Sequence, residues 1–509
     1  MSSLEKLNDP CLVYLAKKIQ GQSGRLLLIG GLVRNELIAR ELHCPLRSEL
    51  GEAPDLSQQD CDVVVFGLDI DELCATLSEI GQTSLIGHRT FSHRKVKEPS
   101  LVNVRINDTD FSLSLSRRID NDNVTFDPSS SVREDSLARD FRANAVYFDP
   151  LKPAGEEFLD PLGGIDDIKA RRLELCSEKG LVVDPLRILR AMSFVSRLSF
   201  TPGALLLKAT SQSWRDLEQI PLERLWPEWR KWAASRWPRF GLDYLKTSGA
   251  LSFWPQLAKM VGSPQLYKFH PEGDVWSHTL LVVEAMSNLN LPLSSGRVFL
   301  TMACLLHDIG KPLVSHINER GQVSTYGHAK AGYPVAKNFL QSIMAPSHIQ
   351  KSILRIIDRH MDLSFQEPTT IKLRILARRL APFCNLEHFW AIAMADWNGR
   401  MPFPWRFPWT LEEFLAPVGG QKGPGPIPLE AKELMVALGL SGGPTVGRLM
   451  DIVTEAFDTG QITDRSEALE LAAVALADPD YRPDKAPIPS TLLLADDKES
   501  ERAFFSGAR

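Results

Sequence analysis

Two aspartates separated by one residue stand at the start of a short apolar segment. Asp60 and Asp62 flank a cysteine, and residues 63–66 read Val-Val-Val-Phe, which predicts a buried strand. Side chains alternate along a strand, so both carboxylates are expected on the same side. Such a pair suits two hard divalent cations, as phosphoryl or nucleotidyl transfer requires. The plain alternative is a solvated strand end.

A glycine turn precedes this acidic pair in the chain. The apolar residues 25–29 predict a second buried strand, Gly30 and Gly31 follow it, and Arg34 lies one helical turn further on. Glycines let backbone N–H groups approach a triphosphate, a helix N-terminus favours its negative charge, and an arginine adds a charge-assisted hydrogen bond. An ordinary strand–helix turn is the alternative.

A later acidic and basic group suggests recognition of a base. Asp184, Arg187 and Arg190 follow each other at helical spacing, which places Asp184 and Arg187 on one face of a predicted helix. An Asp beside an Arg offers acceptors and donors that can pair with the Watson–Crick edge of a base. A surface ion pair is the commoner use of such residues.

Histidines and aspartates recur through the middle of the chain, in a region with a helical pattern. No single helix can bring them together, but a bundle in which each helix points one residue inward can do so. Mixed imidazole and carboxylate ligands suit Mn, Fe, Co, Ni or Mg better than a structural zinc. Isolated core or surface histidines are the alternative. The residues concerned are His278, His307, Asp308, His328, His360 and Asp396.

The predicted elements place these groups in two kinds of structure. Short apolar or alternating segments predict strands at 25–29, 62–66, 103–106, 110–115 and 145–148, and from residue 166 the pattern is helical. The predicted fold is therefore an α/β head followed by an all-α neck, body, bundle and tail. The expected parts are a head (1–165), a neck and body (166–260), a helical bundle (265–400), a Pro/Gly-rich linker (401–428) and a helical tail with a disordered end (429–509).

Composition narrows the class of protein. The 509 residues carry 58 Lys and Arg against 63 Asp and Glu, a net charge of −5, which excludes a wholly basic nucleic-acid coat. The seven cysteines form no C-x-x-C pair, as expected of reduced thiols. We find no leader pattern and no apolar segment approaching ~18 residues. These features predict a cytoplasmic protein that does not span a membrane.

The ordered motifs of residues 25–200 resemble class II tRNA nucleotidyltransferases and bacterial poly(A) polymerases. The set is Gly30-Gly31-x-Val-Arg34, Asp60-x-Asp62, Arg139-Asp140-Phe-x-x-Asn144-Ala145, Asp160-Pro-x-Gly-Gly164 and Asp184-Pro-x-Arg187-x-Leu-Arg190. The resemblance implies that Asp60 and Asp62 bind catalytic Mg²⁺, with Asp110 as the third carboxylate. It further implies a nucleotide site made of Gly30, Gly31, Arg34, Arg139, Asp140, Asn144, Asp184, Arg187 and Arg190.

The histidines in the middle of the chain occur in sequence motifs that resemble those of the HD phosphohydrolase superfamily. His270-Pro-Glu-Gly-Asp-Val-Trp-Ser-His278, His307-Asp308-Ile-Gly-Lys311 and Ala395-Asp396 carry this resemblance. It implies a divalent transition metal or Mg²⁺ on the six residues named above, with Lys311 as a phosphate contact. Relatives hydrolyse cyclic nucleotides or phosphate esters.

Together these resemblances imply addition of C and A to tRNA 3′ ends from CTP and ATP, with a second, hydrolytic activity. Expected partners are the tRNA 3′ end, CTP and ATP, and neither DNA nor a membrane. The Arg-, Lys- and Trp-containing stretch 222–239 is a candidate for tRNA phosphate and base contacts, although its Trp residues are more often core. The tail at 429–476 resembles the part of the family that grips the tRNA elbow.

Several positions depart from the family pattern and keep alternatives open. Asn35 stands where relatives carry Asp, Val183 replaces a Glu, Ala138 replaces an Arg, and Ser193 stands where an Arg is usual. The segment 117–128, where relatives carry a longer basic loop, is short. A restricted CC-adding or A-adding enzyme is one alternative, and poly(A) polymerase ranks lower. In another, the head only binds RNA and the HD site is the sole catalyst.

Overall fold

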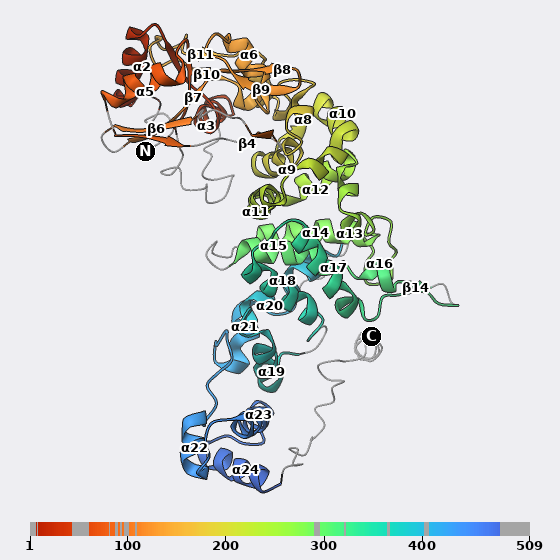
Figure 1. Ribbon diagram of the computed structural model, residues 1–509. Coiled ribbons are helices and arrows are strands. Elements are labelled where there is room, and N and C mark those ends of the chain that lie inside the picture. Colours follow the sequence, from red (N-terminus) through yellow and green to blue (C-terminus); the bar gives the residue numbers. More distant parts are fainter. Residues whose placement is uncertain are drawn as a thin grey trace. The chain divides into compact units, whose positions relative to one another are not determined.

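The computed structural model divides into two compact units, which we describe separately. Unit 1 comprises residues 1–258 with 342–344, and unit 2 comprises 259–341 with 345–509 (Figure 1). The residues that the structure describes are 7, 9–42, 61–80, 82–86, 90–91, 94–95, 101–106, 109–289, 296–319, 322–363, 367–401 and 407–478.

A mixed sheet forms the first part of unit 1. Its described strands have the order β11-β10-β1-β2-β7-β6-β3. β2 runs parallel to β7, and the other neighbours are antiparallel. The predicted strands coincide with five of these elements. The bounds are β1 Arg25–Leu28, β2 Cys61–Phe66, β3 Gln82–Ile86, β6 Leu101–Ile106, β7 Thr109–Leu115, β10 Tyr147–Phe148 and β11 Phe158–Leu159.

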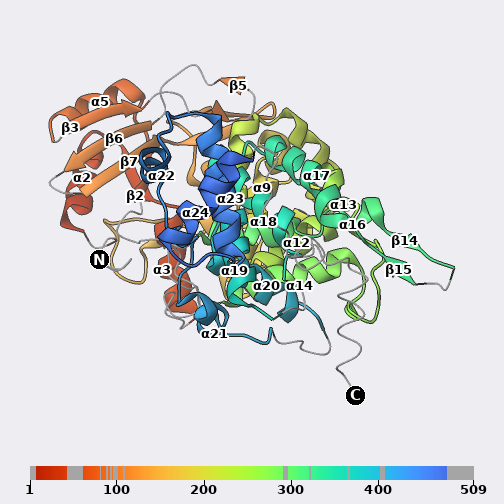
Figure 2. The same ribbon diagram turned by 90° about the horizontal axis from the view of Figure 1, so that it is seen from below.

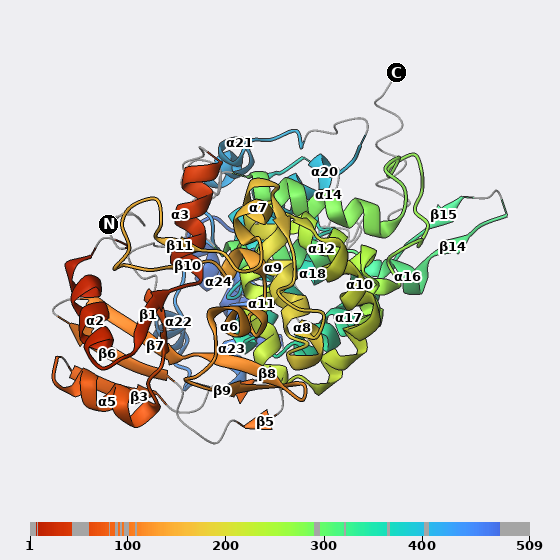
Figure 3. The same cartoon turned by 90° about the horizontal axis from the view of Figure 1, so that it is seen from above.

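Apolar strand residues hold this sheet together, and helices pack on it. Leu27, Val64 and Tyr147 are fully buried in one core cluster, which explains why the apolar segments form central strands. α2 (Pro10–Gly21) packs on β1 and next to α5 (Ile70–Ser78) (Figure 1). α3 (Gly31–Glu41) starts directly after β1 and its turn, and packs beside α7 (Gly164–Lys169) (Figure 3).

A helical region completes unit 1. α9 (Arg187–Leu198) packs against α11 (Leu225–Ala233) and α12 (Pro238–Thr247). A Cβ at Gly241 would meet the carbonyl oxygen of Met192 at 2.7 Å, so only glycine lets α12 approach α9 this closely. Trp229 and Trp232 are fully buried, which assigns these two aromatics of the basic, Trp-containing stretch to the core.

Unit 2 is built mainly from helices. α14 (Val275–Asn288) packs against α15 (Arg297–Leu306) and α20 (Leu386–Asn398), and α15 also contacts α18 (Ser347–Arg359). A Cβ at Gly399 would lie 2.9 Å from the backbone nitrogen of Val282, so this glycine permits the close approach of α14 and the end of α20. α17 (His328–Ser342) lies in the same bundle, and the hairpin of β14 (His316–Ile317) and β15 (Val323–Ser324) projects from it (Figure 2).

The C-terminal part of unit 2 wraps on the bundle and then forms three helices. Trp390 Nε1 donates to the carbonyl of Trp409, and Leu386 N donates to that of Lys422, so the Pro/Gly-rich segment packs on α20. The last helices are α22 (Ala431–Leu438), α23 (Pro444–Asp458) and α24 (Arg465–Ala477), which share one apolar core. None of the helices described in either unit combines the length and the hydropathy needed to cross a membrane.

Candidate functional site

An acidic edge occurs where β2 and β7 begin. Asp62 on β2 is exposed and pairs in register with Ser112 on β7. Residues paired in a sheet point to the same face, and Asp110 lies two residues before Ser112, so the carboxylates of Asp62 and Asp110 share a face at the same end. Asp110 is also exposed, with Arg105 Nε 3.8 Å from its Oδ1. Asp60 lies outside the described residues.

Gly30 closes this edge from the side of β1. Ile29 N donates to the carbonyl of Asp62 at 3.1 Å, which holds the turn against the start of β2. Gly30 has a φ of +84°, and a Cβ built there would lie 3.1 Å from Asp62 Oδ2. Glycine is therefore required both by conformation and by space. The N-terminus of α3, which begins at Gly31, consequently lies beside the Asp62 carboxylate.

Arg34 is fixed by two asparagines. Its Nη1 donates to Asn144 Oδ1 at 2.6 Å, and its Nη2 donates to Asn35 Oδ1 at 2.8 Å. Its guanidinium lies over the Phe194 ring, 5.2 Å from the centroid. Burial lowers the pKa of Arg34 to about 9, so the side chain is charged at neutral pH. Asn35, which departs from the family pattern, thus holds Arg34 as a neutral acceptor.

Arg139 and Asp140 belong to two neighbouring buried networks of hydrogen bonds and ion pairs. Arg139 Nε donates to Asp135 Oδ2 at 2.7 Å, and despite burial this carboxylate raises the pKa of Arg139. Asp140 Oδ1 accepts from Asn144 Nδ2, while its Oδ2 pairs with Arg190. Burial alone would raise the pKa of Asp140, but Arg190 and Arg187 lower it to about 2. Asp140 therefore links the head to α9 as an ionised carboxylate.

Asp184 and Arg187 differ from the arrangement that their spacing predicts. α9 begins at Arg187, and Asp184 is extended (φ −147°, ψ 95°), so the two do not share a helix face. The residue before a proline avoids the helical region, and Pro185 follows Asp184. Arg224 Nη2 lies 3.2 Å from Asp184 Oδ2, and Arg187 donates to the backbone carbonyls of residues 138 and 139 at 2.7 and 2.8 Å.

The remaining departures from the family pattern are buried. Val183 and Ala138 belong to the core, with 3% and 0% of their surface exposed. Ser193 donates to the Arg190 carbonyl and lies 3.1 Å from Glu228 Oε2. Glu228 also accepts from Lys231. A buried carboxylate with two polar partners, Ser193 and Lys231, thus lies on this side of α9.

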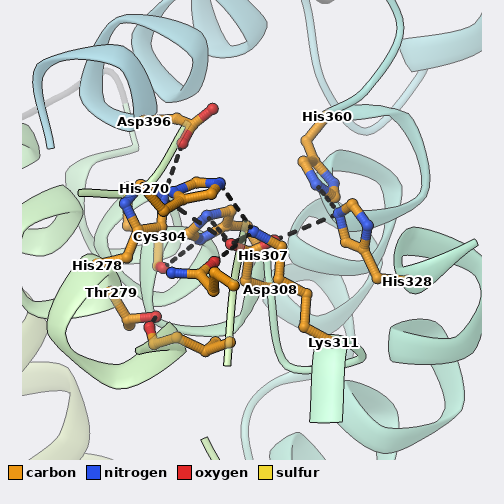
Figure 4. A network of polar contacts seen from close by, with 12 residues as sticks. His270, His278, Thr279, Cys304, His307, Asp308, Lys311, His328, His360 and Asp396 are labelled. Atoms are coloured by element: carbon orange, nitrogen blue, oxygen red, sulfur yellow. Dashed lines mark hydrogen bonds and ion pairs between the residues drawn. The ribbon is translucent and has the colours of Figure 1, made fainter. Parts of the chain in front are cut away.

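The second candidate site lies in unit 2, where six predicted ligands converge (Figure 4). His278 belongs to α14, His307 and Asp308 directly follow α15, and His328 starts α17. His360 caps the end of α18, and Asp396 belongs to α20. A Cβ at Gly310 would lie 2.1 Å from the carbonyl oxygen of His328, so glycine allows the two segments to meet. One residue or pair from each of five elements therefore forms the cluster, as the bundle hypothesis predicts.

Short distances connect the six side chains. His278 Nε2 lies 2.9 Å from Asp396 Oδ1, and Asp308 Oδ2 lies 3.2 Å from His307 Nε2. Asp308 Oδ1 lies 3.3 Å from His328 Nε2, which in turn lies 3.0 Å from His360 Nε2. All six are buried except for Asp396, whose side chain is 21% exposed. These six residues divide into two separate groups, each of which could hold a metal: His278, His307 and Asp396, and Asp308, His328 and His360.

The tautomers that backbone contacts impose fit a metal ion. His307, His328 and His360 each place Nδ1 at 2.8–3.0 Å from a backbone carbonyl, so Nδ1 carries the proton and Nε2 carries a lone pair. The lone pairs of His328 and His360 then face each other, and buried His307 Nε2 has no hydrogen-bond partner. A cation between these atoms removes both conflicts. The donor set therefore fits a divalent metal.

The charges of the cluster agree with this arrangement. Burial lowers the pKa of His328 to about 3 and that of His360 to about 4, so both imidazoles are neutral, as metal ligation requires. Burial alone would raise the pKa of Asp308, but His307 and Lys311 hold it well below its usual value. Asp396 is likewise held well below its usual pKa against burial, chiefly by Arg400, which donates to its Oδ2 at 2.9 Å.

Two further side chains lie beside the cluster: Glu272, which the motifs did not single out, and Lys311, which they did. Glu272 Oε1 lies 2.7 Å from His278 Nδ1 and 2.9 Å from His270 Nδ1, so it orients the ligand histidine. Lys311 Nζ, predicted to contact phosphate, is buried and lies 2.6 Å from Asp308 Oδ2 and 2.7 Å from Gln265 Oε1. The H-x-E spacing before His278 was the available signal for Glu272.

Comparison with known families assigns both regions. Residues 26–174 match the poly A polymerase head domain, and residues 275–379 match the HD domain. The chain thus combines a nucleotidyltransferase head with an HD domain, which confirms the resemblance, the α/β-then-helical fold and the enzyme class predicted from the sequence.

Comparisons with individual proteins support the same two domains. The chain is 29% identical to the Multifunctional CCA protein of Shewanella frigidimarina over 67% of this chain and 74% of the relative. The Bacillus stearothermophilus CCA-adding enzyme in complex with CTP has a similar fold, with a TM-score of 0.60, 19% identity, and coverage of 91% of this chain and 97% of that one. The Thermotoga maritima CCA-adding enzyme complexed with tRNA_CCA gives a TM-score of 0.56 at 16% identity, with coverage of 93% and 98%.

Proposed function

We propose that the head of this chain adds C and A to the 3′ end of tRNA from CTP and ATP without a nucleic-acid template. The observation that carries this proposal is the shared face of Asp62 and Asp110 beside the Gly30 turn. Relatives along most of the chain are Multifunctional CCA proteins, and a similar fold binds CTP. The activity accounts for both the acidic edge and the glycine turn.

Each residue of the head has a role in this reaction. Asp60, Asp62 and Asp110 would hold Mg²⁺, which supplies the positive charge that activates the tRNA 3′ hydroxyl and neutralises the triphosphate. The backbone at Gly30 and Gly31 faces the phosphates at the N-terminus of α3. Arg34, held by its two asparagines, adds a fixed positive charge behind them. Attack on the α-phosphorus forms one P–O bond and releases pyrophosphate.

Selection of the base falls to the start of α9. Asp184 and Arg187 remain our candidates for reading the Watson–Crick edge, with Arg139, Asp140, Asn144 and Arg190 around the ribose and phosphates. To meet a base, Asp184 has to exchange its contact with Arg224 for one with the nucleotide. Val183 supplies no acceptor that could share this task. A CC-adding or A-adding restriction is the specific alternative.

We further propose that the HD domain is a metal-dependent phosphohydrolase. His278, His307, Asp308, His328, His360 and Asp396 would hold a divalent transition metal or Mg²⁺, which lowers the pKa of a bound water and directs it to phosphorus. Glu272 orients His278, and Lys311, which donates to Gln265, pairs with Asp308. Lys311 is thereby a positioning residue in this proposal rather than a direct phosphate contact.

The test for the head is incorporation of labelled nucleotides into tRNA that lacks its 3′-terminal CCA. CTP alone should extend the RNA by two nucleotides, and CTP with ATP by three. Extension that stops after two under both conditions would establish the CC-adding alternative. Addition of A only to tRNA already ending in CC would establish the A-adding one. No incorporation in any mixture would support a head that only binds RNA.

A further inference from the structure

One face of the head sheet carries polar side chains beside the acidic edge. Side chains alternate along a strand, so a strand that buries one face has polar residues at every second position. On β6, buried residues alternate with half-buried Asn103 and exposed Arg105, and on β7 they alternate with exposed Asp110 and half-buried Ser112. β2, β7 and β6 are neighbours in the sheet (Figure 2), and their register places these four side chains on the same face as Asp62.

Ser112 and Asn103 continue the row that Asp62 begins. Ser112 pairs in register with Asp62 on one side and with Asn103 on the other, and neighbouring strands lie about 4.8 Å apart. Ser112 Oγ donates to Asn103 Oδ1 at 2.9 Å. Within the part of the chain that the structure describes, this bond leaves the Asn103 N–H groups and the Ser112 lone pairs for a ligand. The pair therefore offers both a donor and an acceptor next to Asp62.

The place of this pair relative to Gly30 decides which ligand it meets. β2 lies between β1, which leads into the Gly30 turn, and β7, which carries Ser112. In the proposed reaction the triphosphate lies at the Gly30 turn and the N-terminus of α3. An in-line displacement brings the attacking oxygen to phosphorus from the side opposite the leaving pyrophosphate. The RNA 3′ hydroxyl therefore approaches Asp62 from the side of β7 and β6.

We propose that Ser112 and Asn103 bind the 2′-hydroxyl of the 3′-terminal ribose of the RNA, and that Arg105 binds the adjoining phosphate. This inference rests on the nucleotidyltransferase function proposed for the head and names the residues that hold its acceptor. The 2′- and 3′-hydroxyls occupy neighbouring ribose carbons, so a 3′-hydroxyl at Asp62 places the 2′-hydroxyl within reach of Ser112. A hydroxyl both donates and accepts, which matches the pair, and RNA carries this hydroxyl where DNA does not.

Arg105 supplies the positive charge on this face. It lies two residues after Asn103, about 6–7 Å along the strand, and pairs in register with Asp110. Its Nε lies 3.8 Å from Asp110 Oδ1, and the two side chains are 55% and 67% exposed. An exposed ion pair of this length is weak, so the guanidinium is available to a phosphate.

The experiment uses the full-length protein and two tRNA transcripts that lack CCA, one ending in a ribonucleotide and one in a 2′-deoxynucleotide. Both keep the 3′ hydroxyl, so both can accept C from CTP. The measured quantity is the ratio of kcat/KM for the ribose-ended RNA to kcat/KM for the deoxy-ended RNA. We expect a ratio of about ten for wild type, the combined effect of two hydrogen bonds. Ser112→Ala and Asn103→Ala should each bring it close to one by slowing only the ribose-ended RNA.

Matched variants test the position of these contacts. Ser114 lies two residues further along β7 and its hydroxyl donates to the Val63 carbonyl at 3.2 Å, so Ser114→Ala should keep the wild-type ratio. Arg105→Gln should also keep the ratio but raise the KM for both RNAs about tenfold. Arg25→Gln, at the end of β1 remote from the Gly30 turn, should leave that KM unchanged.

The outcomes separate this inference from the function on which it rests. A wild-type ratio in both Ser112→Ala and Asn103→Ala, or equal use of the two RNAs by wild type, would overturn the ribose contact while the nucleotidyltransferase stands. An unchanged KM in Arg105→Gln would overturn the phosphate contact. Wild-type protein that extends neither RNA would overturn the proposed function together with this inference.

Discussion

His328 and His360 face each other through their Nε2 atoms at 3.0 Å, while the Nδ1 atom of each is bonded to a backbone carbonyl. Two neutral imidazoles in this tautomer cannot hydrogen-bond to each other, because neither Nε2 carries a proton. The contact is therefore unfavourable in the metal-free protein and becomes favourable when a cation takes both lone pairs. It is a specific indication of metal binding that does not depend on the His-Asp motif.

Removal of one of these ligands should weaken metal binding. We expect His360→Ala to lower the affinity for Mn²⁺ at least about tenfold, since even the loss of an outer-shell partner commonly costs 10- to 100-fold. Titration calorimetry of the chelator-treated protein measures this directly. The matched control is His348→Ala, an exposed histidine of α18. Equal affinities of the two variants would contradict the assignment of His360 as a ligand.

Lys311 is expected to stabilise the bundle. Its ammonium is buried between Asp308 and Gln265, so Lys311→Met leaves a buried carboxylate without its closest positive partner. Breaking such a pair costs about 3–5 kcal/mol, which urea unfolding of the metal-free protein should show as a lower free energy of unfolding. Lys337→Met, on the exposed side of α17, is the control. Unchanged stability with a raised KM for a phosphate substrate would instead favour the direct phosphate contact.

Acid should weaken the ion pair between Asp140 of the head and Arg190 of α9. The folded-state pKa of Asp140 is about 2, below the ordinary 3.8, because Arg190 and Arg187 outweigh burial. A lowered carboxyl pKa stabilises the fold above pH ~4, and this contribution, about 2 kcal/mol, is lost as the pH falls from about 4 to 2. Asp140→Asn should therefore lower the free energy of unfolding of unit 1 at pH 5, and the difference from wild type should shrink towards pH 2.5.

Urea denaturation at a series of pH values measures this difference. Asp71→Asn, at an exposed position of α5, serves as the control and should follow the wild type throughout. The contrary result is a free energy of unfolding of wild type that exceeds that of Asp140→Asn by the same amount from pH 5 to 2.5. This result would show that the charge of the Asp140 carboxylate does not stabilise the fold.

Gly30 should tolerate no side chain. Gly30→Ala places a Cβ 3.1 Å from Asp62 Oδ2 in a conformation that L-residues rarely adopt, so the carboxylate has to move. We expect CTP incorporation to fall at least about tenfold, because displacements near 1 Å at a reacting centre are costly. Gly21→Ala, whose Cβ would meet nothing within 4 Å, is the matched control. Full activity of Gly30→Ala would mean that Asp62 is not held by this turn.

Much of this architecture follows from local sequence patterns. The apolar segments at 25–29 and 62–66 become central strands because each can be buried on both faces. The six candidate ligands of the bundle could be listed from their residue types and motifs, and they meet because each lies at a helix end or on an inward face. Such features depend on residues that are close together in the sequence, so they can be predicted from the sequence alone.

Other features depend on contacts between distant segments. The hydrogen bond from Lys311 to Gln265 follows from packing, which no spacing in the sequence encodes. Asp184 is different, because Pro185 disfavours a helical conformation at the residue before it, and the spacing of Asp184 and Arg187 does not contain this local signal. Loop residues near prolines therefore merit separate treatment when a binding motif is assigned to a helix.

In the proposed function, the acidic edge of the head catalyses nucleotide addition to tRNA. The most direct measurement is CTP and ATP incorporation into tRNA lacking CCA by Asp62→Asn, compared with Asp71→Asn on exposed α5. We predict three added nucleotides for wild type and for Asp71→Asn, and a loss of at least about a hundredfold in rate for Asp62→Asn. Incorporation by Asp62→Asn at the wild-type rate would show that the acidic edge of the head does not catalyse the addition.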